Sequence, residues 1–143
     1  MKYASIGSIS HGTLLNEYLL SALSDELKYH VERNPDYSSR NSHMCLVGAA
    51  GWIDPDSDNA SELVNDLQNA LQEYAAPYTY FGTNEGDGSD FGFWPSMDAI
   101  EELPHISDPN EVENHLGEDC VFVNDHGNVT VYGADGKVIW DCV

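Results

Sequence analysis

The sequence has few basic residues: five Lys and Arg stand against 25 Asp and Glu in 143 residues, which gives a formal net charge of −20. No Lys or Arg occurs between Asn41 and Gly136, a segment with 19 of the carboxylates. Because such a charge repels phosphates, it argues against direct binding to nucleic acid. It is typical of a protein with a cationic partner, or of one whose acidic surface only keeps it soluble.

The chain also lacks a long apolar run. Nothing approaches the ~20 apolar residues that a membrane span needs, and Met1–Gly7 has no apolar stretch of the kind found in signal peptides. We therefore expect a cytoplasmic protein with no membrane partner. The three cysteines are an odd number without framework spacing, which predicts buried thiols.

Sequence motifs for catalysis are missing as well. There is no Gly-x-Ser-x-Gly, Walker A or Rossmann pattern, and the six histidines show no spaced metal-binding pair. We therefore predict a protein that is not an enzyme, with no catalytic residues, cofactor or metal. A metal-binding or hydrolytic protein stays open as an alternative, and it would need His11, His126 and nearby acids to converge in one pocket.

The helical periodicity is clear in two segments. In Leu14–Arg33 the residues Leu15, Leu19, Leu23, Leu27 and Val31 recur every four positions. Ala60–Tyr74 has apolar residues at i, i+3 and i+4, and Asn59 and Glu62 have capping-box spacing at its start. Together with Thr13 as a candidate N-cap, these features predict the two main amphipathic helices of a single domain, residues 1–143.

Other segments give weaker signals. Lys2–Ile9 is compatible with a first strand, Ser96–Leu103 with a short helix and Asp108–Leu116 with a helical turn. Met44–Ile53 is apolar but rich in small residues, so helix and strand both remain open. For this last segment we favour a buried strand or a close-packed turn.

Aromatic residues flank a polar, glycine-rich stretch within Tyr78–Pro95. Aromatic side chains suit a half-buried pleated surface, and Asn, Gly, Asp and Ser suit the turn that reverses a strand. We predict a β-hairpin with a long acidic tip that carries Glu85, Asp87 and Asp90.

The C-terminal part predicts a three-stranded antiparallel meander, with strands at Cys120–Asn124, Asn128–Tyr132 and Lys137–Cys142. Two-residue turns at His126-Gly127 and Asp135-Gly136 would pair Asp125 with Asn128, and Ala134 with Lys137. A one-residue slip would exchange the faces of a strand. In the expected register the core face holds Phe122, Val129, Val131, Val138, Trp140 and Cys142.

These elements predict an α+β fold. One antiparallel sheet, formed by the aromatic hairpin and the C-terminal meander, would pack against the two amphipathic helices.

An acidic stretch precedes the second helix. Asp54-x-Asp56-x-Asp58 resembles the start of a calcium loop, but Asn59 and Asn65 stand where that loop has Gly and a bidentate Glu. Helix capping explains the stretch without a metal, and the tip at Asn84–Asp90 is better explained as a solvated turn.

Three sequence segments resemble those of a known protein family: Ile9-Ser10-His11-Gly12-Thr13, Gly86–Pro95 with the preceding Tyr80-Phe81-Gly82, and Val123–Thr130. They resemble an uncharacterised family of small acidic proteins from bacteriophage and plasmid-type genomes. The resemblance implies an accessory role in a mobile element, but it carries over no activity and no functional residues. Some small acidic proteins of this origin are DNA mimics, which is an analogy only.

We interpret the chain as a non-enzymatic acidic protein of a phage or mobile element. It would bind a basic, nucleic-acid-binding host protein, such as a defence nuclease, in the manner of a DNA-mimic inhibitor. A related possibility is an immunity protein against a basic nuclease toxin, and the alternative is a small accessory or structural domain whose acidity gives only solubility. The candidate partner-binding residues are Asp54, Asp56, Asp58, Glu62, Asp66, Glu85, Asp87 and Asp90.

Overall fold

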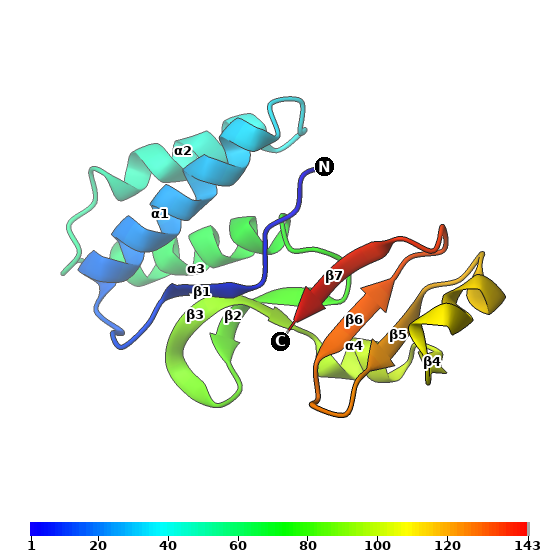
Figure 1. Ribbon diagram of the computed structural model, residues 1–143. Helices are drawn as coiled ribbons and strands as arrows, with labels where there is room; N and C mark the ends of the chain where they lie inside the picture. Colours follow the sequence, from blue (N-terminus) through cyan, green and yellow to red (C-terminus); the bar gives the residue numbers. More distant parts are fainter. Residues whose placement is uncertain (143) are drawn as a thin grey trace. The chain divides into compact units, whose positions relative to one another are not determined.

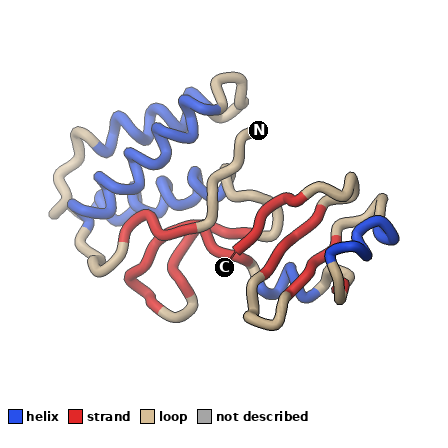
Figure 2. The backbone as a smooth tube through the Cα atoms, in the orientation of Figure 1, coloured by secondary structure: helices blue, strands red, loops and turns tan. Residues whose placement is uncertain are grey.

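The computed structural model describes residues 1–142 and has an α+β fold with antiparallel sheets, as the sequence predicted (Figures 1 and 2). The chain forms two compact units. Unit 1 comprises Met1–Ala75 and Tyr80–Trp94, and unit 2 comprises Ala76–Thr79 and the chain from residue 95. The expected single domain stays a prediction.

Unit 1 combines three helices with a three-stranded sheet. Figure 1 shows the helices together on one side of this sheet. The helices are α1 (Asn16–Arg33), α2 (Arg40–Ala50) and α3 (Asp58–Gln72). The strands, in the order β1-β3-β2, are β1 (Gly7–Ser10), β3 (Asp87–Pro95) and β2 (Thr79–Asn84).

The core of unit 1 comes from the predicted apolar stripes. Both helices bury the residues that recur at three- and four-residue spacing, because these side chains share one helix face. Aromatic side chains of the β2–β3 hairpin complete the cluster. Its main members are Leu19, Leu23, Leu27 and Val31 of α1, Leu63, Val64, Leu67 and Leu71 of α3, and Tyr74, Phe81, Phe91 and Phe93.

The helix starts differ from the expected ones. Leu15, not Thr13, is the N-cap of α1, and the Thr13 hydroxyl accepts a hydrogen bond from the Leu15 amide at 3.1 Å. Helix α3 begins after Ser57, so Asn59 lies inside the helix and no capping box forms. The apolar periodicity therefore located both helices, and the capping signals misplaced each start by two residues.

The segment Met44–Ile53, for which we favoured a strand or turn, is mostly helix α2. His43, Val47 and Ala50 face the core at helical spacing, and the small residues between them had masked this period. Cys45 is exposed on α2, contrary to the expectation of buried thiols, whereas Cys120 in unit 2 is buried.

The predicted aromatic hairpin is formed by β2 and β3, but its tip is short. Only Glu85 and Gly86 separate the strands. The predicted first strand is reduced to β1, which pairs with β3 through Ser8 and Gly92. A Cβ atom on Gly92 would lie 2.2 Å from the carbonyl oxygen of Gly7, so this pairing requires glycine.

Side chains occupy several backbone groups of β2, which is an edge strand of its sheet. The Phe81 amide donates to the Gln72 side chain at 2.9 Å. The Trp94 indole donates to the Gly82 carbonyl at 3.0 Å, and the Tyr80 hydroxyl to the Thr83 carbonyl at 2.9 Å.

Unit 2 contains a second sheet, so the hairpin and the meander do not share one sheet as we expected. Its order is β4-β5-β6-β7, and β4 pairs parallel with β5. The elements are α4 (Met97–Glu101), β4 (His105–Ile106), the 3₁₀ helix η1 (Pro109–His115), β5 (Cys120–Val123), β6 (Val129–Tyr132) and β7 (Val138–Cys142).

The meander is present, but its first register is slipped by one residue. Val123 pairs with Val129, where the expected turn would have paired Val123 with Thr130. The loop has three residues and ends in Gly127, whose φ of 82° permits a turn followed by a left-handed residue. As a result Val121 is buried and Phe122 is only half-buried.

The second register is correct at Val131 and Trp140, which pair and are both buried, as is Val129. A bulge next to Tyr132 takes up the extra residue of another three-residue loop. Val138 was expected in the core but is 52% exposed, because the bulge separates it from the regular ladder. Cys142, also expected there, is half-buried.

Tyr78 links the start of unit 2 to its sheet. Its hydroxyl donates to the Asp119 carboxylate, which together with burial raises the pKa of Tyr78 to about 12. Its φ of 65° is unusual for a residue with a side chain. Trp140 adds a second link by donating to the Pro77 carbonyl at 2.7 Å.

Candidate functional site

All eight candidate partner-binding carboxylates belong to unit 1. Five lie between the end of α2 and the middle of α3, and three lie on the β2–β3 hairpin. Seven are exposed and Asp90 is half-buried. The candidates therefore form two groups: Asp54, Asp56, Asp58, Glu62 and Asp66 in the first, and Glu85, Asp87 and Asp90 in the second.

Three members of the first group follow one face of α3. Asp58, Glu62 and Asp66 are exposed and recur every four residues, away from the buried stripe of the helix. Neighbouring Cβ atoms at this spacing are about 5–6 Å apart. Among residues 1–142, these three side chains make no hydrogen bond or ion pair, so they are available to a partner.

The loop before α3 is a hydrogen-bonded turn. The Asp54 side chain accepts a hydrogen bond from the Asp56 amide at 3.0 Å, and the Ser57 hydroxyl donates to the Asp54 carbonyl at 2.6 Å. Asp54 is thus engaged in its own turn. The turn leaves the carboxylate of Asp56 exposed beside the start of α3.

The hairpin carboxylates are less available. Asp87 accepts hydrogen bonds from the Ser89 amide at 3.0 Å and from its hydroxyl at 2.8 Å, which lower the pKa of Asp87. Asp90 accepts a hydrogen bond from the Ser8 hydroxyl. Only Glu85 extends from this group without such a partner among the described residues.

An open pocket of about 720 Å³ lies between the start of α1 and the start of α3. We call it the acidic pocket. The Asn16 side chain donates to the Ser61 hydroxyl at 3.2 Å and thereby joins the two helices there. Three carboxylates and no basic residue line the pocket, whose members are Leu14, Leu15, Asn16, Glu17, Pro55, Asp56, Ser57, Asp58 and Ser61.

Large apolar side chains are exposed in unit 1, and two of them, Leu14 and Leu15, line the acidic pocket. Leu14 and Leu15 are 63% and 61% exposed, and Tyr18 follows on the first turn of α1. Trp52, in the connection from α2 to α3, is 91% exposed. Sequence analysis missed these residues, because Leu15 fits the buried stripe and Trp52 belongs to an apolar run.

Acidity by itself does not distinguish this surface. Unit 1 has 14 carboxylates and four basic residues, and unit 2 has 11 carboxylates and one, so each has a formal net charge of −10. What distinguishes the acidic pocket is the combination of carboxylates with exposed leucines and a cavity.

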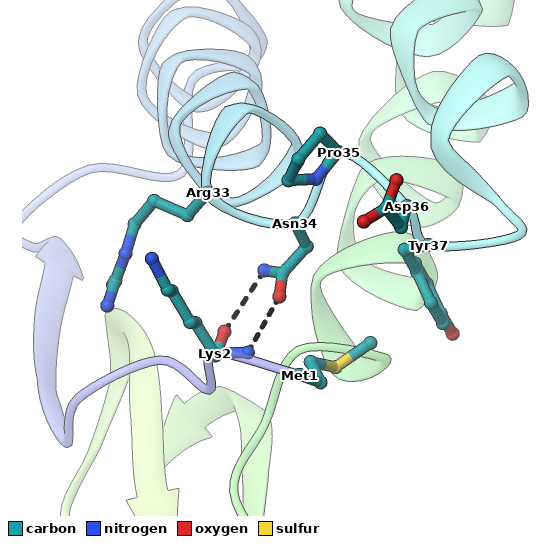
Figure 3. Close-up of a pocket in the computed structure, with 7 residues that line it drawn as sticks. All are labelled: Met1, Lys2, Arg33, Asn34, Pro35, Asp36 and Tyr37. Atoms are coloured by element: carbon teal, nitrogen blue, oxygen red, sulfur yellow. Dashed lines mark hydrogen bonds between the residues drawn. The ribbon is translucent and has the colours of Figure 1, made fainter.

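A second pocket of about 530 Å³ includes two of the five basic residues, Lys2 and Arg33 (Figure 3). The Asn34 side chain accepts from the Lys2 amide at 2.7 Å and donates to the Lys2 carbonyl at 3.1 Å. Figure 3 shows Lys2 and Arg33 on one side of Asn34, and Asp36 and Tyr37 on the other. The Asp36 carboxylate offsets part of the positive charge, which weakens this pocket as an anion site.

A polar network with the buried side chains of His43 and Tyr74 at its centre, which the sequence did not predict, connects α2 to the end of α3. His43 contacts the Tyr74 hydroxyl through Nδ1 and the Glu73 carboxylate through Nε2, both at 2.8 Å. Glu73 also accepts hydrogen bonds from Tyr37 at 2.7 Å and Ser39 at 3.2 Å. Both His43 ring nitrogens therefore have partners within the network.

The same network sets the acidity of its members. Burial raises the pKa of Glu73, but hydrogen bonds from Tyr37 and His43 outweigh burial and leave this pKa below its ordinary value. The hydrogen bond to Glu73 and burial raise the pKa of Tyr37. Burial raises the pKa of Tyr74 to about 12. The charged form of Glu73 is therefore part of the folded structure.

His30 stacks on Tyr74 with ring centroids 5.5 Å apart, and its Nε2 lies 2.6 Å from the Glu26 carboxylate. Its Nδ1 is buried without a hydrogen-bond partner among the described residues. A pocket of about 300 Å³ lies beside His30 and β1.

His11 and His126, the alternative hydrolytic residues, belong to different units and are both exposed in turns. Neither lines any of the three pockets. Within residues 1–142, no three His, Cys, Asp or Glu side chains are grouped so that they could hold a metal ion. In the same part of the chain, no helix is long and apolar enough for a membrane span.

Comparison with protein-family models, curated proteins and solved structures finds no match to this chain.

Proposed function

We propose that this chain is a non-enzymatic acidic protein that binds a basic, nucleic-acid-binding surface of a partner protein. The acidic pocket is the observation that carries the proposal. Glu17, Asp56 and Asp58 line it with no Lys or Arg, and exposed Leu14 and Leu15 lie beside them. Such a surface offers carboxylates to cations and apolar area to the side chains between those cations.

The energetics favour a basic partner. Arg and Lys form charge-assisted hydrogen bonds with carboxylates that water alone solvates in the free protein. The net charge of −20 also speeds the encounter with a cationic surface at low ionic strength. Rows such as Asp58, Glu62 and Asp66 present negative charges at a regular interval, which is how a protein competes for a site that binds phosphates.

The resemblance to small acidic phage and plasmid proteins supports an accessory role in a mobile element. On that basis we propose a host nuclease, or another nucleic-acid-binding host protein in the cytoplasm, as the partner. The chain would block the basic groove of such a protein as a DNA-mimic inhibitor does.

A second candidate function is a small accessory domain whose acidity only provides solubility. The equal net charge of −10 in the two units favours this alternative, because acidity selected for a partner need not extend over both.

Two variants of equal net charge separate these functions. The site variant carries Asp54→Asn, Asp56→Asn, Asp58→Asn and Glu62→Gln in unit 1. The control variant carries Asp98→Asn, Glu101→Gln, Glu102→Gln and Glu113→Gln at exposed positions of unit 2. Each is used with the native protein to capture proteins from bacterial lysate at low and high salt, followed by mass spectrometry and elution with duplex DNA.

We expect the native protein and the control variant to retain one basic nucleic-acid-binding protein at low salt, which DNA displaces. The site variant should lose it. Equal loss in both variants would point to non-specific charge attraction, and recovery of no specific protein would leave the solubility function in its place.

A further inference from the structure

We infer that the acidic pocket is the docking site for an amphipathic basic helix of the partner, with Leu14 and Leu15 as the apolar contacts. This inference rests on the proposed function and specifies the part of the partner that is recognised. It is carried by three observations: a cavity, exposed apolar side chains beside it, and carboxylates without a cation.

A bound partner would remove this exposed apolar area from water, which is favourable. Leu14 and Leu15 line the pocket and are 63% and 61% exposed, although leucine side chains are stabilised when they leave water. Tyr18 lies three residues after Leu15 and four after Leu14, so all three side chains gather at the first turn of α1. Tryptophan and tyrosine are the residues most often found at energetic centres of protein interfaces.

The charges around this apolar area select the occupant. A wholly apolar partner would bury Glu17, Asp56 and Asp58 without counter-charges, which is costly. A second copy of the chain would bring further carboxylates against them, and nucleic acid or an anionic membrane would be repelled. A segment with apolar side chains flanked by Lys and Arg satisfies both properties of the surface.

The shape of the site favours a helix over an added strand. Only the start of α1, the loop before α3 and the start of α3 line the pocket, so it offers no strand edge for backbone pairing. An amphipathic helix instead inserts its apolar face and leaves its flanking cations at the rim. The rim carboxylates are then placed to pair with them.

The test uses a labelled synthetic peptide, (Lys-Leu-Leu-Lys-Leu-Leu-Lys)₂, as the probe. Fluorescence anisotropy at about 50 mM and about 300 mM NaCl measures its affinity for the native protein, where salt weakens exposed charge attraction. A second peptide of the same composition, with leucines spread around the helix, reports whether one apolar face is required.

Two double variants locate the binding surface without changing the net charge. Leu14→Ala with Leu15→Ala removes the proposed contacts, and Met97→Ala with Leu116→Ala removes exposed apolar side chains of unit 2. Because all four side chains are exposed, both variants should fold, which circular dichroism verifies.

We expect the first variant and the second peptide each to weaken binding at least about tenfold. The unit 2 variant should keep the native affinity within about twofold. Equal affinity of all three proteins, or of both peptides, would overturn the docking site while leaving a diffuse electrostatic function intact. Absence of binding to the native protein at the lower salt would also overturn it, and the lysate capture then decides the proposed function separately.

Discussion

At the scale of single residues, His43 shows how a polar side chain can hold a core together. It is 3% exposed and contacts Tyr74 and Glu73 through its two ring nitrogens. Buried polar groups are tolerated when all their hydrogen bonds are made, and they become costly when one partner is removed.

We therefore predict that His43→Ala lowers the free energy of unfolding by about 2–4 kcal/mol, since it leaves a cavity and removes a partner of the buried Tyr74 hydroxyl. Urea denaturation measures the change. Ser42→Ala, on the exposed side of the same helix, is the matched control and should change stability by less than about 0.5 kcal/mol. Similar values for both variants would mean that the network does not stabilise the fold.

Glu73 gives a pH dependence with a definite sign. Its pKa is lower in the folded protein than its ordinary value of 4.5, so the unfolded chain takes up this proton more readily. The resulting stabilisation is present above pH 4.5 and is lost as the pH falls through the lower folded pKa. Glu73→Gln should thus lose less stability than the native protein on acidification through this range.

Denaturation of the two proteins between pH 6 and pH 3 measures that difference. Glu32→Gln is the control, because Glu32 is exposed and its only described ion pair is with Lys28 at 4.0 Å. Parallel curves for the native protein and Glu73→Gln would contradict the assigned role of the carboxylate.

At the scale of elements, Gly92 determines how closely β1 can approach β3. A Cβ at this position would lie 2.2 Å from the Gly7 carbonyl oxygen and 2.9 Å from the Ser8 Cα, both backbone atoms. Relief requires β1 to move, which would break its pairing with β3.

We predict that Gly92→Ala destabilises the protein by about 1–3 kcal/mol and increases amide hydrogen exchange in β1. Gly88→Ala on the same strand is the control, because nothing lies within 4 Å of its added Cβ. If the two variants exchange alike in β1, the close approach does not limit the pairing.

Elements with a strong local signal could be predicted from sequence. The periodicity that includes Leu23 and Leu27 predicted α1, and Gly127 and Gly136 predicted the positions of the two turns of the meander. The register of β5 could not be read, because a three-residue loop and a two-residue loop both accept His-Gly at the turn. In α2 the buried residue is His43, a polar side chain that a search for apolar periodicity does not detect.

Only part of the candidate site could be predicted from the sequence. Asp56 and Asp58 could be chosen because acids before a helix stand out. Leu14 and Leu15 could not, because an apolar residue gives no sign of exposure until the elements around it are packed. The pocket itself depends on α1 and α3 starting side by side, which is a long-range relation.

At the scale of the whole molecule, self-repulsion is the main consequence of the charge. Each unit has a formal net charge of −10, and the only Lys or Arg ion pair described is that of Lys28 with Glu32. Like charges that stay unpaired oppose compaction, and salt screens them over about 8–10 Å at moderate ionic strength.

We predict that NaCl stabilises the protein, with a higher unfolding midpoint at about 500 mM than at about 10 mM. Thermal melts in NaCl, with equal ionic strength of sodium sulfate as a comparison, measure the effect. A midpoint that stays constant or falls with salt would show that repulsion among the carboxylates costs little.

The occupied edge of β2 has a consequence for how this protein behaves when crowded. The side chains of Gln72 and Tyr80 form hydrogen bonds with the Phe81 amide and the Thr83 carbonyl, two backbone groups that would otherwise be open to another strand. Sheet growth from one molecule to the next is thereby discouraged at this edge, which is a main route to fibrils. The folded protein can therefore reach a high concentration without aggregating. Its molecules repel one another through their negative charge, and side chains occupy backbone groups on the β2 edge.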